Sequence, residues 1–499
     1  MRRVQAVIVG LILAQGLATL QVYLSNAAYL DKLTALQKAG YLTVPNRLVM
    51  DTLARFGPAF FGGLFFTLTV GLALSLAALT AAWISNRFFP ESRGFQTGLL
   101  VFWAGTLVWV NQDGWAPLAS AYFLVIPPSV FYLARKHPSA SAKGRSGRRV
   151  LLHPACILIL LMVGADQMTP GMFTRIRDRL LLTNPVGRSI NDFYYRYTLY
   201  PAQVFKSPAQ DLIRAVYLAE NLEPPLAEQL KWTLTRLDYP VIDTPKASDL
   251  VIYQNGESLI FAHDGKSILS VPPDALLKSP RDTLQAFSRG VDRFGPFRRV
   301  TFLSLMAVSG LFIYLILYLP SYFFAWIFGR AVQGRFQKPL PVSMAAAVLC
   351  VGAGITLLSA ASAEKPPRLP PDLLKNQLTS PDPAERVTAL RYLYARKIDI
   401  APYEVHRKMA KSPQPLERYW LARVLEFSRS PQTYETNLAL LSDPQINTAY
   451  MAYLALGRRG DRRAVAEILE RLNSEDRWYV QLYAYKALRR LGWRQTVSG

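Results

Sequence analysis

The sequence predicts a mainly α-helical protein that crosses a membrane about seven times and carries an α+β domain and a helical-repeat array outside it. Three observations lead to this fold class. Apolar residues make up 51% of the 499 residues, and they gather in runs long enough to cross a bilayer. Short alternating segments in the middle of the chain are separated by Asn-Gly and Asp-Gly pairs, which favour hairpin turns. Near the C-terminus, Ala484 repeats the position of Ala452 at an interval of 32 residues.

The apolar runs define seven predicted transmembrane helices, because about 20 apolar residues form a helix that spans the hydrocarbon core. Five of them belong to a predicted membrane domain, residues 1–164, and two more lie within residues 300–362. The predicted spans are Val4–Leu24, Pro58–Ile84, Phe95–Val110, Pro117–Ala134, Val150–Val163, Val300–Gly329 and Val342–Ala361.

Basic residues gather in four places that lie on one side of the membrane if there are seven spans. Positive charge is retained on the cytoplasmic side. We therefore expect a multi-pass protein of a bacterial inner membrane, with a cytoplasmic N-terminus and an extracytoplasmic C-terminus. The clusters are Arg2–Arg3, Arg87–Arg93, Arg135–Arg149 and Arg330–Lys338.

The first residues, Met1–Ala27, also resemble a signal peptide with a small-residue cleavage site. Their apolar run is longer than a usual signal-peptide core, so an uncleaved anchor is favoured. With either interpretation, the chain from Ala28 onward starts outside the cytoplasm.

The net charge of +23 has two readings, nucleic-acid binding or attraction to anionic lipid. The apolar runs favour membrane lipid as the partner, so we expect no nucleic acid. The two cysteines, Cys156 and Cys350, lie inside apolar runs, which excludes a disulfide framework and a zinc site that needs several thiolates.

The middle domain, residues 165–299, is predicted to be α+β and extracytoplasmic. Three short strands form a meander, separated by Asn255-Gly256 and Asp264-Gly265. The aromatic cluster Phe193–Tyr200 indicates an interfacial belt or a buried helix face, or alternatively a docking surface. The predicted strands are Asp249–Gln254, Ser258–His263 and Ser267–Val271, and the predicted helices are Phe173–Leu182, Pro224–Leu237 and Asp274–Phe294.

The tail, residues 363–499, carries a repeated helical pattern. In its clearest copy, Ala455-Leu456-Gly457 is followed by Gly460-Asp461, which is suited to end one helix and start the next. This tail resembles HEAT-like repeats, in particular the short type related to phycobilisome-lyase repeats. The resemblance implies an α-solenoid that binds other proteins rather than one that catalyses a reaction.

Aromatic residues are numerous in the tail for such an array. They fit the repeat core, and they also fit a partner surface, where Trp, Tyr and Arg are favoured. Trp478 and Tyr479 begin the final helix beside Arg477, where no further repeat follows to cover them. The predicted partner-binding residues are Trp420, Arg477, Trp478 and Tyr479.

A search for catalytic or transport chemistry identifies no residues. The four histidines, His137, His153, His263 and His406, are not spaced as metal ligands, and no phosphate-binding or nucleophile motif occurs. No ionisable residue lies at the centre of a predicted span. We therefore predict no catalytic, metal or cofactor-binding residue and no small-molecule substrate.

The leading functional hypothesis is an inner-membrane scaffold or assembly subunit that docks envelope proteins through its tail and middle domain. A subunit of a transporter or channel is the alternative, and a membrane enzyme is a further one.

Overall fold

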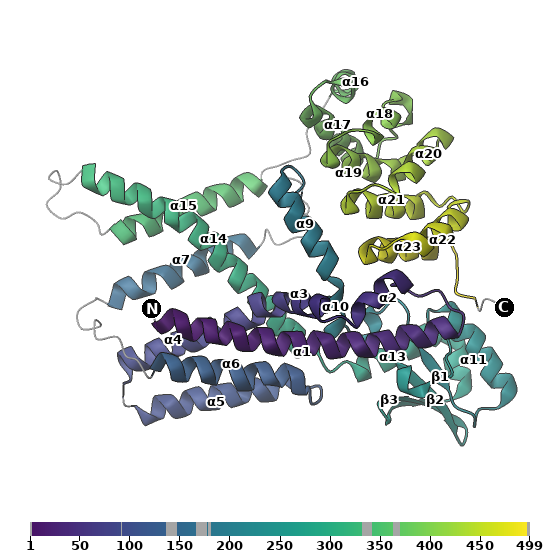
Figure 1. The fold of residues 1–499 in the computed structure, drawn as a ribbon, viewed down its shortest axis with the longest axis horizontal. Helices are drawn as coiled ribbons and strands as arrows, with labels where there is room; N and C mark the ends of the chain where they lie inside the picture. Colours follow the sequence, from purple (N-terminus) through teal and green to yellow (C-terminus); the bar gives the residue numbers. More distant parts are fainter. Residues whose placement is uncertain are drawn as a thin grey trace. The chain divides into compact units, whose positions relative to one another are not determined.

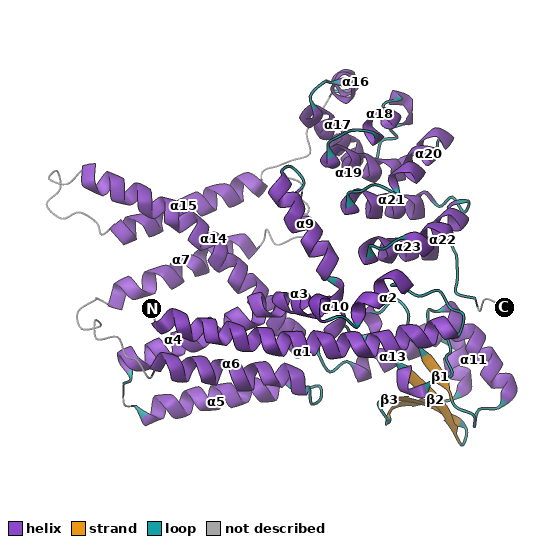
Figure 2. Ribbon diagram, in the orientation of Figure 1, coloured by secondary structure: helices purple, strands orange, loops and turns teal. Residues whose placement is uncertain are grey.

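A computed structural model describes residues 2–90, 92–135, 147–165, 177, 181–331, 342–362 and 370–496. The described chain is mainly helical, with one small sheet (Figures 1 and 2). Most of the predicted basic loop 135–149 and of the predicted helix Phe173–Leu182 lies outside the described residues.

The chain forms two compact units, and each unit is assembled from three separated stretches. The first unit contains Met1–Ala18, Leu64–Ile176 and Gly295–Lys365, and the second contains Thr19–Gly63, Arg177–Phe294 and Pro366–Gly499. Neither unit therefore corresponds to one continuous stretch of the chain. The first helix, α1 (Arg2–Lys38), contributes residues to both units.

All seven predicted spans are helical in the structure. Among the described residues, four helices are long and apolar enough to cross a membrane: Arg3–Lys38, Phe56–Phe88, Pro117–Arg135 and Gly295–Arg330. Two shorter apolar helices cover Ala155–Gly164 and Val342–Leu357, so a count of seven spans stays a prediction. The elements are α3 (Phe56–Phe66), a π-helical turn (Thr67–Gly71), α4 (Leu72–Phe88), α5 (Arg93–Val110), α6 (Pro117–Arg135), α7 (Gly147–Ala165), α14 (Gly295–Ala331) and α15 (Val342–Ser362).

Small residues let α1 and α4 approach closely in the first unit. A Cβ on Gly10 would overlap Ser75, and a Cβ on Gly71 would overlap Ala14. The polar Gln15 is also satisfied here, because its side-chain oxygen accepts a hydrogen bond of 2.7 Å from the Thr67 hydroxyl. Small residues and paired polar side chains are what apolar helices use to pack against one another without water.

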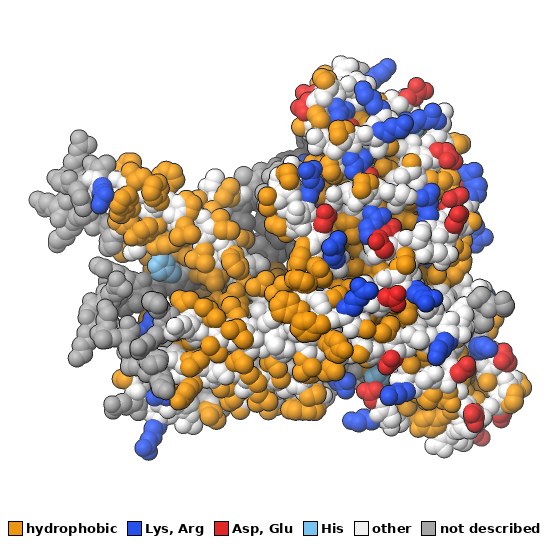
Figure 3. Space-filling view, in the orientation of Figure 1, with side chains coloured by type: hydrophobic (Ala, Val, Ile, Leu, Met, Phe, Trp, Pro, Cys, Tyr) orange, Lys and Arg blue, Asp and Glu red, His pale blue; other side chains and the backbone are white. Residues whose placement is uncertain are grey.

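The visible surface of this first unit is largely hydrophobic over α1, α4, α5 and α6 (Figure 3). The exposed apolar side chains of α1 and α5 include Ile12, Val101 and Phe102, at 65%, 63% and 74% exposure. Soluble proteins rarely expose so broad an apolar surface, and such surfaces are typical of protein–protein or membrane interaction sites.

Trp103 of α5 donates a hydrogen bond to a backbone carbonyl of α6 that a proline leaves without its helical donor. Pro127 has no N–H, so the carbonyl of Phe123, four residues earlier, lacks its helical donor. The Trp103 indole Nε1 of α5 donates to that carbonyl at 2.9 Å. The α5–α6 pair is therefore held by a hydrogen bond that depends on the proline.

This pairing predicts a double-mutant result. Trp103→Phe keeps an aromatic ring but leaves the Phe123 carbonyl without a donor, so we expect a loss of about 1–3 kcal/mol in unfolding free energy. Pro127→Ala supplies a backbone N–H to the same carbonyl, so adding it to Trp103→Phe should recover much of the loss. Denaturant unfolding in detergent measures both. Unchanged stability of Trp103→Phe would contradict the role of the indole.

The second unit contains a four-stranded sheet. β2 (Leu250–Asn255), β3 (Ser258–His263) and β4 (Lys266–Val271) pair antiparallel, which confirms the predicted meander. The turns use Gly256 and Gly265 at φ 59° and 74°, a region that glycine enters without steric cost. The sequence did not predict the edge strand β1 (Val216–Leu218), which pairs parallel to β2 and has only three residues.

Helices cover this sheet and flank it in sequence. The predicted single helix Asp274–Phe294 is wrong in one respect, because the chain breaks at Ser279-Pro280 into two helices. Proline disfavours the helical conformation of the residue before it. The helices of this region are α2 (Arg47–Leu53), α9 (Pro185–Tyr197), α10 (Leu199–Val204), α11 (Pro224–Arg236), α12 (Pro273–Lys278) and α13 (Pro280–Val291).

The tail forms a stacked array of helix pairs (Figure 1). Its inner layer, as we name it, consists of α17, α19, α21 and α23, which pack side by side in that order. Gly460 ends α21 at φ 75°, as its Gly-Asp pair predicted, and a Cβ on Gly457 would lie 2.9 Å from Ala487 Cα. The helices are α16 (Pro371–Thr379), α17 (Pro383–Arg396), α18 (His406–Ala410), α19 (Pro415–Val424), α20 (Pro431–Leu440), α21 (Ile446–Arg459), α22 (Ala464–Ser474) and α23 (Trp478–Arg490).

Candidate functional site

One face of α9 packs against the inner layer of the array. Asn184 caps the helix by accepting a hydrogen bond from the Gly187 N–H, and Pro185 follows at the first helical position. Gly187, Asn191 and Tyr195 are all buried and recur every four residues, so they share one side of the helix. This side is the face that contacts the array.

Buried polar groups on this α9 face find partners on α21. The Asn191 side-chain amide donates to the Asn447 side-chain oxygen at 2.8 Å, and both side chains are fully buried. The Tyr195 and Tyr450 hydroxyls lie 3.3 Å apart. Burial raises the pKa of both hydroxyls, so they stay protonated and able to donate. Because unpaired buried polar groups are costly, these hydrogen bonds fix a single orientation of α9 about its helix axis.

Two of the four predicted site residues, Trp478 and Tyr479, lie at this contact, and Arg477 precedes them in sequence. The Trp478 indole donates to the backbone carbonyl of Tyr195 at 2.7 Å, and the Tyr479 ring centroid lies 4.6 Å from that of Tyr195. Arg477 forms an ion pair with Glu475 at 2.6 Å and donates to the Asp443 carbonyl at 2.7 Å. In the structure, the partner of Trp478 and Tyr479 is α9 of the same chain, and binding of another protein by these residues stays a prediction.

The fourth predicted residue, Trp420, lies apart from the other three, on α19. It is only 7% exposed, and its ring centroid lies 5.8 Å from that of Tyr394 on α17. The Arg423 guanidinium stacks on both rings, 3.9 Å from Tyr394 and 4.4 Å from Trp420, and Arg391 lies 5.2 Å from Trp420. We call these four residues the arginine–aromatic cluster.

The last repeat is covered by other segments of the chain, although the sequence predicted no following repeat to cover it. The Asn46 side chain donates to the carbonyls of Leu472 and Glu475 at 2.7 and 2.9 Å. On α23, Tyr485 donates to Asp238 at 2.6 Å, and Arg489 forms an ion pair with the same carboxylate at 3.0 Å. Residues far away in sequence therefore replace the missing next repeat.

The α9 contact predicts a position-specific loss of stability. Tyr195→Ala removes a buried ring and its hydroxyl, and large-to-small changes of this kind cost about 3–5 kcal/mol. We expect faster amide hydrogen exchange throughout α9, measured by mass spectrometry of the full chain. Tyr194→Ala is the matched control, because Tyr194 is 56% exposed. Equal exchange in both variants would contradict the assignment of the buried face.

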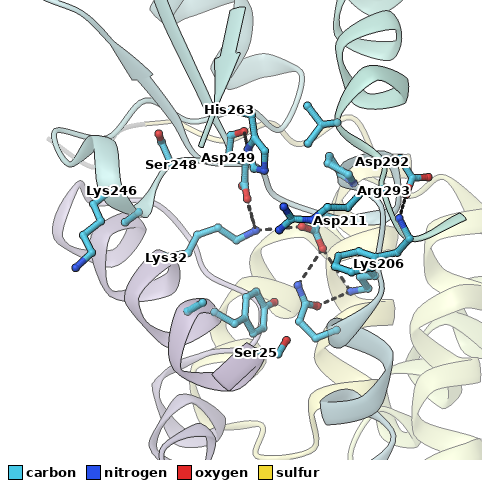
Figure 4. Close-up of a pocket in the computed structure, with 17 residues that line it drawn as sticks. Ser25, Lys32, Lys206, Asp211, Lys246, Ser248, Asp249, His263, Asp292 and Arg293 are labelled. Carbon is cyan, nitrogen blue, oxygen red and sulfur yellow. Dashed lines mark hydrogen bonds and ion pairs between the residues drawn. The ribbon is translucent and has the colours of Figure 1, made fainter. Parts of the chain in front are cut away.

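A second candidate site is a pocket of about 270 Å³ around Lys32, near the end of α1 (Figure 4). The Lys32 ammonium lies 3.1 Å from Asp211 and 3.0 Å from Asp249, and its side chain is 8% exposed. Asp249 also accepts a hydrogen bond of 2.8 Å from the Ala215 backbone N–H. Lys206 lies 3.7 Å from Asp211, so two ammonium groups face two carboxylates.

The charges of this pocket depend on one another. Burial alone would raise the pKa of Asp211, but Lys32 and Lys206 outweigh it, and the pKa lies below its ordinary value. Burial raises the pKa of Asp249, although Lys32 opposes this shift. Burial also lowers the pKa of Lys206, which Asp211 opposes. Because each buried charge in the pocket is balanced by an opposite charge, the arrangement favours a structural role. In this role, the ion pairs of Lys32 hold the end of α1 against the α+β region.

Sequence reasoning missed this site, because its charges are about 180 and 217 residues from Lys32 along the chain. One signal was present: Lys32 is a charged residue in a helix that continues from an apolar run. Such a residue needs a partner when it is buried.

Removal of Lys32 tests the charge triad of Lys32, Asp211 and Asp249. Lys32→Met leaves Asp249 without a counter-charge and Asp211 with Lys206 alone, and breaking a buried pair from one side costs about 3–5 kcal/mol. The double variant Lys32→Met with Asp249→Asn removes that uncompensated carboxylate and keeps the Lys206–Asp211 pair, so it should be more stable than Lys32→Met. Denaturant unfolding followed by tryptophan fluorescence compares them. Equal midpoints for all three proteins would rule out a structural triad.

Comparison with known proteins identifies one region. A family model of HEAT repeats matches residues 403–489, which covers most of the array from α18 to α23. The chain matches no curated protein and no solved structure. The C-terminal region therefore carries HEAT repeats, as its resemblance implied.

Proposed function

We propose that the chain is a multi-pass protein of a bacterial inner membrane that holds its HEAT array outside the cytoplasm and docks envelope proteins on it. The four helices in the described part of the chain that are long and apolar enough to span a membrane support the anchor. The four basic clusters support the orientation. The α+β region and the array belong to one compact unit. A partner bound to the array would therefore be fixed in position relative to the α+β region as well.

The observation that carries this proposal is that the inner layer already binds one helix, α9. That contact uses small, polar and aromatic residues at four-residue spacing, and its buried polar contacts are the Tyr195–Tyr450 pair and the Asn191–Asn447 pair. A surface that binds a helix of its own chain in this way has the shape and hydrogen-bonding groups to bind a helix of another protein.

The arginine–aromatic cluster is the part of the inner layer that we assign to the partner. Tyr394 and Arg423 are half-buried, and Trp, Tyr and Arg are the residues in which binding energy concentrates at protein interfaces. The two guanidinium groups of the cluster, on Arg391 and Arg423, favour an acidic partner. We therefore expect an amphipathic helix with carboxylates beside its apolar residues.

A transport subunit is a second candidate, because α4, α5 and α6 surround a groove of about 460 Å³. Apolar side chains such as Leu74, Phe102 and Phe131 make up most of its lining. This lining suits a hydrocarbon chain better than a hydrated solute, so the groove supports lipid contact more than transport.

Photo-crosslinking tests the scaffold proposal in cells. A benzophenone amino acid at Tyr394 should give a discrete adduct with another protein, and the same group at Glu470, exposed on α22, should not. The double change Arg391→Ala with Arg423→Ala should abolish the Tyr394 adduct, whereas Lys411→Ala, an exposed control, should leave it. Adducts of equal yield at both positions, or at neither, would contradict docking at the cluster.

A further inference from the structure

Helix α9 has an apolar face that the array does not cover. Val186, Ile190 and Phe193 are 70%, 56% and 44% exposed, and half-buried Tyr197 continues the row. Their spacing of four, three and four residues places them along one side of the helix. We call these four residues the apolar stripe.

A third side of α9 is polar. Ser189, Asp192 and Arg196 are exposed, and helical spacing places them between the stripe and the face buried on the array. The helix therefore has a face bound to the array, a face suited to water and an apolar face that stays largely exposed at Val186 and Ile190. Three large apolar side chains in a row form a contiguous exposed apolar patch, which is unfavourable in water and is typical of an interaction surface.

The apolar stripe is continuous with the start of a candidate membrane span. The Phe61 ring of α3 lies 6.0 Å from Phe193 and 5.0 Å from Tyr197, centroid to centroid. Phe56 and Phe60 on the same helix are 67% and 37% exposed. This helix continues as the apolar segment Phe56–Phe88, one of the four long enough to cross a bilayer.

We propose that the apolar stripe lies in the membrane interface, so that α9 is a membrane-surface helix whose ligand is the lipid bilayer. This rests on the proposed membrane location of the chain. Amphipathic helices lie in the interface with their apolar face among the acyl chains, and tyrosine rings favour the headgroup level. Arg196, on the polar side that borders the stripe, adds attraction to anionic headgroups.

Contact with lipid gives α9 a specific task. One face is fixed to the array by Asn191 and Tyr195, and the stripe is fixed to the bilayer surface. The helix therefore joins the inner layer of the HEAT array to lipid. It thereby fixes the orientation of that layer relative to the bilayer surface.

Spin labels on the full chain test this placement. After Cys156→Ser and Cys350→Ser, single labels are attached at Val186→Cys and Ile190→Cys on the stripe, and at Ser189→Cys and Asp192→Cys on the polar side. The protein is placed in nanodiscs of phosphatidylethanolamine and phosphatidylglycerol. Collision rates with oxygen, which concentrates in lipid, are compared with those of a water-soluble nickel chelate. Leu68→Cys, 51% exposed in the candidate span, reports on membrane insertion.

We expect oxygen to dominate at Val186, Ile190 and Leu68, and the nickel chelate to dominate at Ser189 and Asp192. Chelate access at all four α9 positions, with lipid contact at Leu68, would overturn the lipid contact of α9 and leave the membrane anchor intact. Shielding of the stripe from both reagents would also overturn it, because protein would then cover the stripe. Chelate access at Leu68 would overturn the membrane anchor itself.

Discussion

The buried amide pair of Asn191 and Asn447 is the interaction on which the arrangement of α9 depends. Neither side chain has access to water, so each must find its hydrogen bonds within the protein. The Tyr195–Tyr450 contact and the Trp478 indole add the same requirement at neighbouring positions. Rotation of α9 by one residue would leave several of these groups unpaired at once. The direction of the apolar stripe follows from this constraint, because the stripe occupies a fixed angle relative to the buried face.

The second unit is held together by polar contacts between segments that are distant along the chain. Lys32 joins the end of α1 to Asp211 and Asp249, Asn46 caps carbonyls at the end of α22, and Asp238 holds α23. Each contact buries a charge or an amide whose partner comes from another segment. Removal of one partner therefore disturbs more than one segment. A HEAT array normally needs a capping element at its end, and here the loop after α1 and the α+β region provide it.

The first unit meets a related constraint with fewer polar groups. Where little water is present, a backbone carbonyl without a donor is expensive. The Trp103 indole satisfies the carbonyl that Pro127 leaves open, and Thr67 satisfies Gln15. Close helix contact comes from glycine and alanine rather than from shape-filling aliphatic side chains, as at Gly10 and Gly71. These features are consistent with the proposed membrane anchor.

Local sequence patterns determined most of the elements, although not the edge strand β1 or the break at Ser279-Pro280. Apolar runs, hairpin turn pairs and the 32-residue repeat act through neighbouring residues, so they predicted the seven apolar helices, the meander and the HEAT repeats. The tertiary structure decided which faces are buried. Trp478 and Tyr479 are typical of a partner surface by composition, yet they contact α9, and Lys32 finds its carboxylates about 180 and 217 residues away. Burial depends on which distant segment packs against a face, and helical periodicity contains no information about that segment.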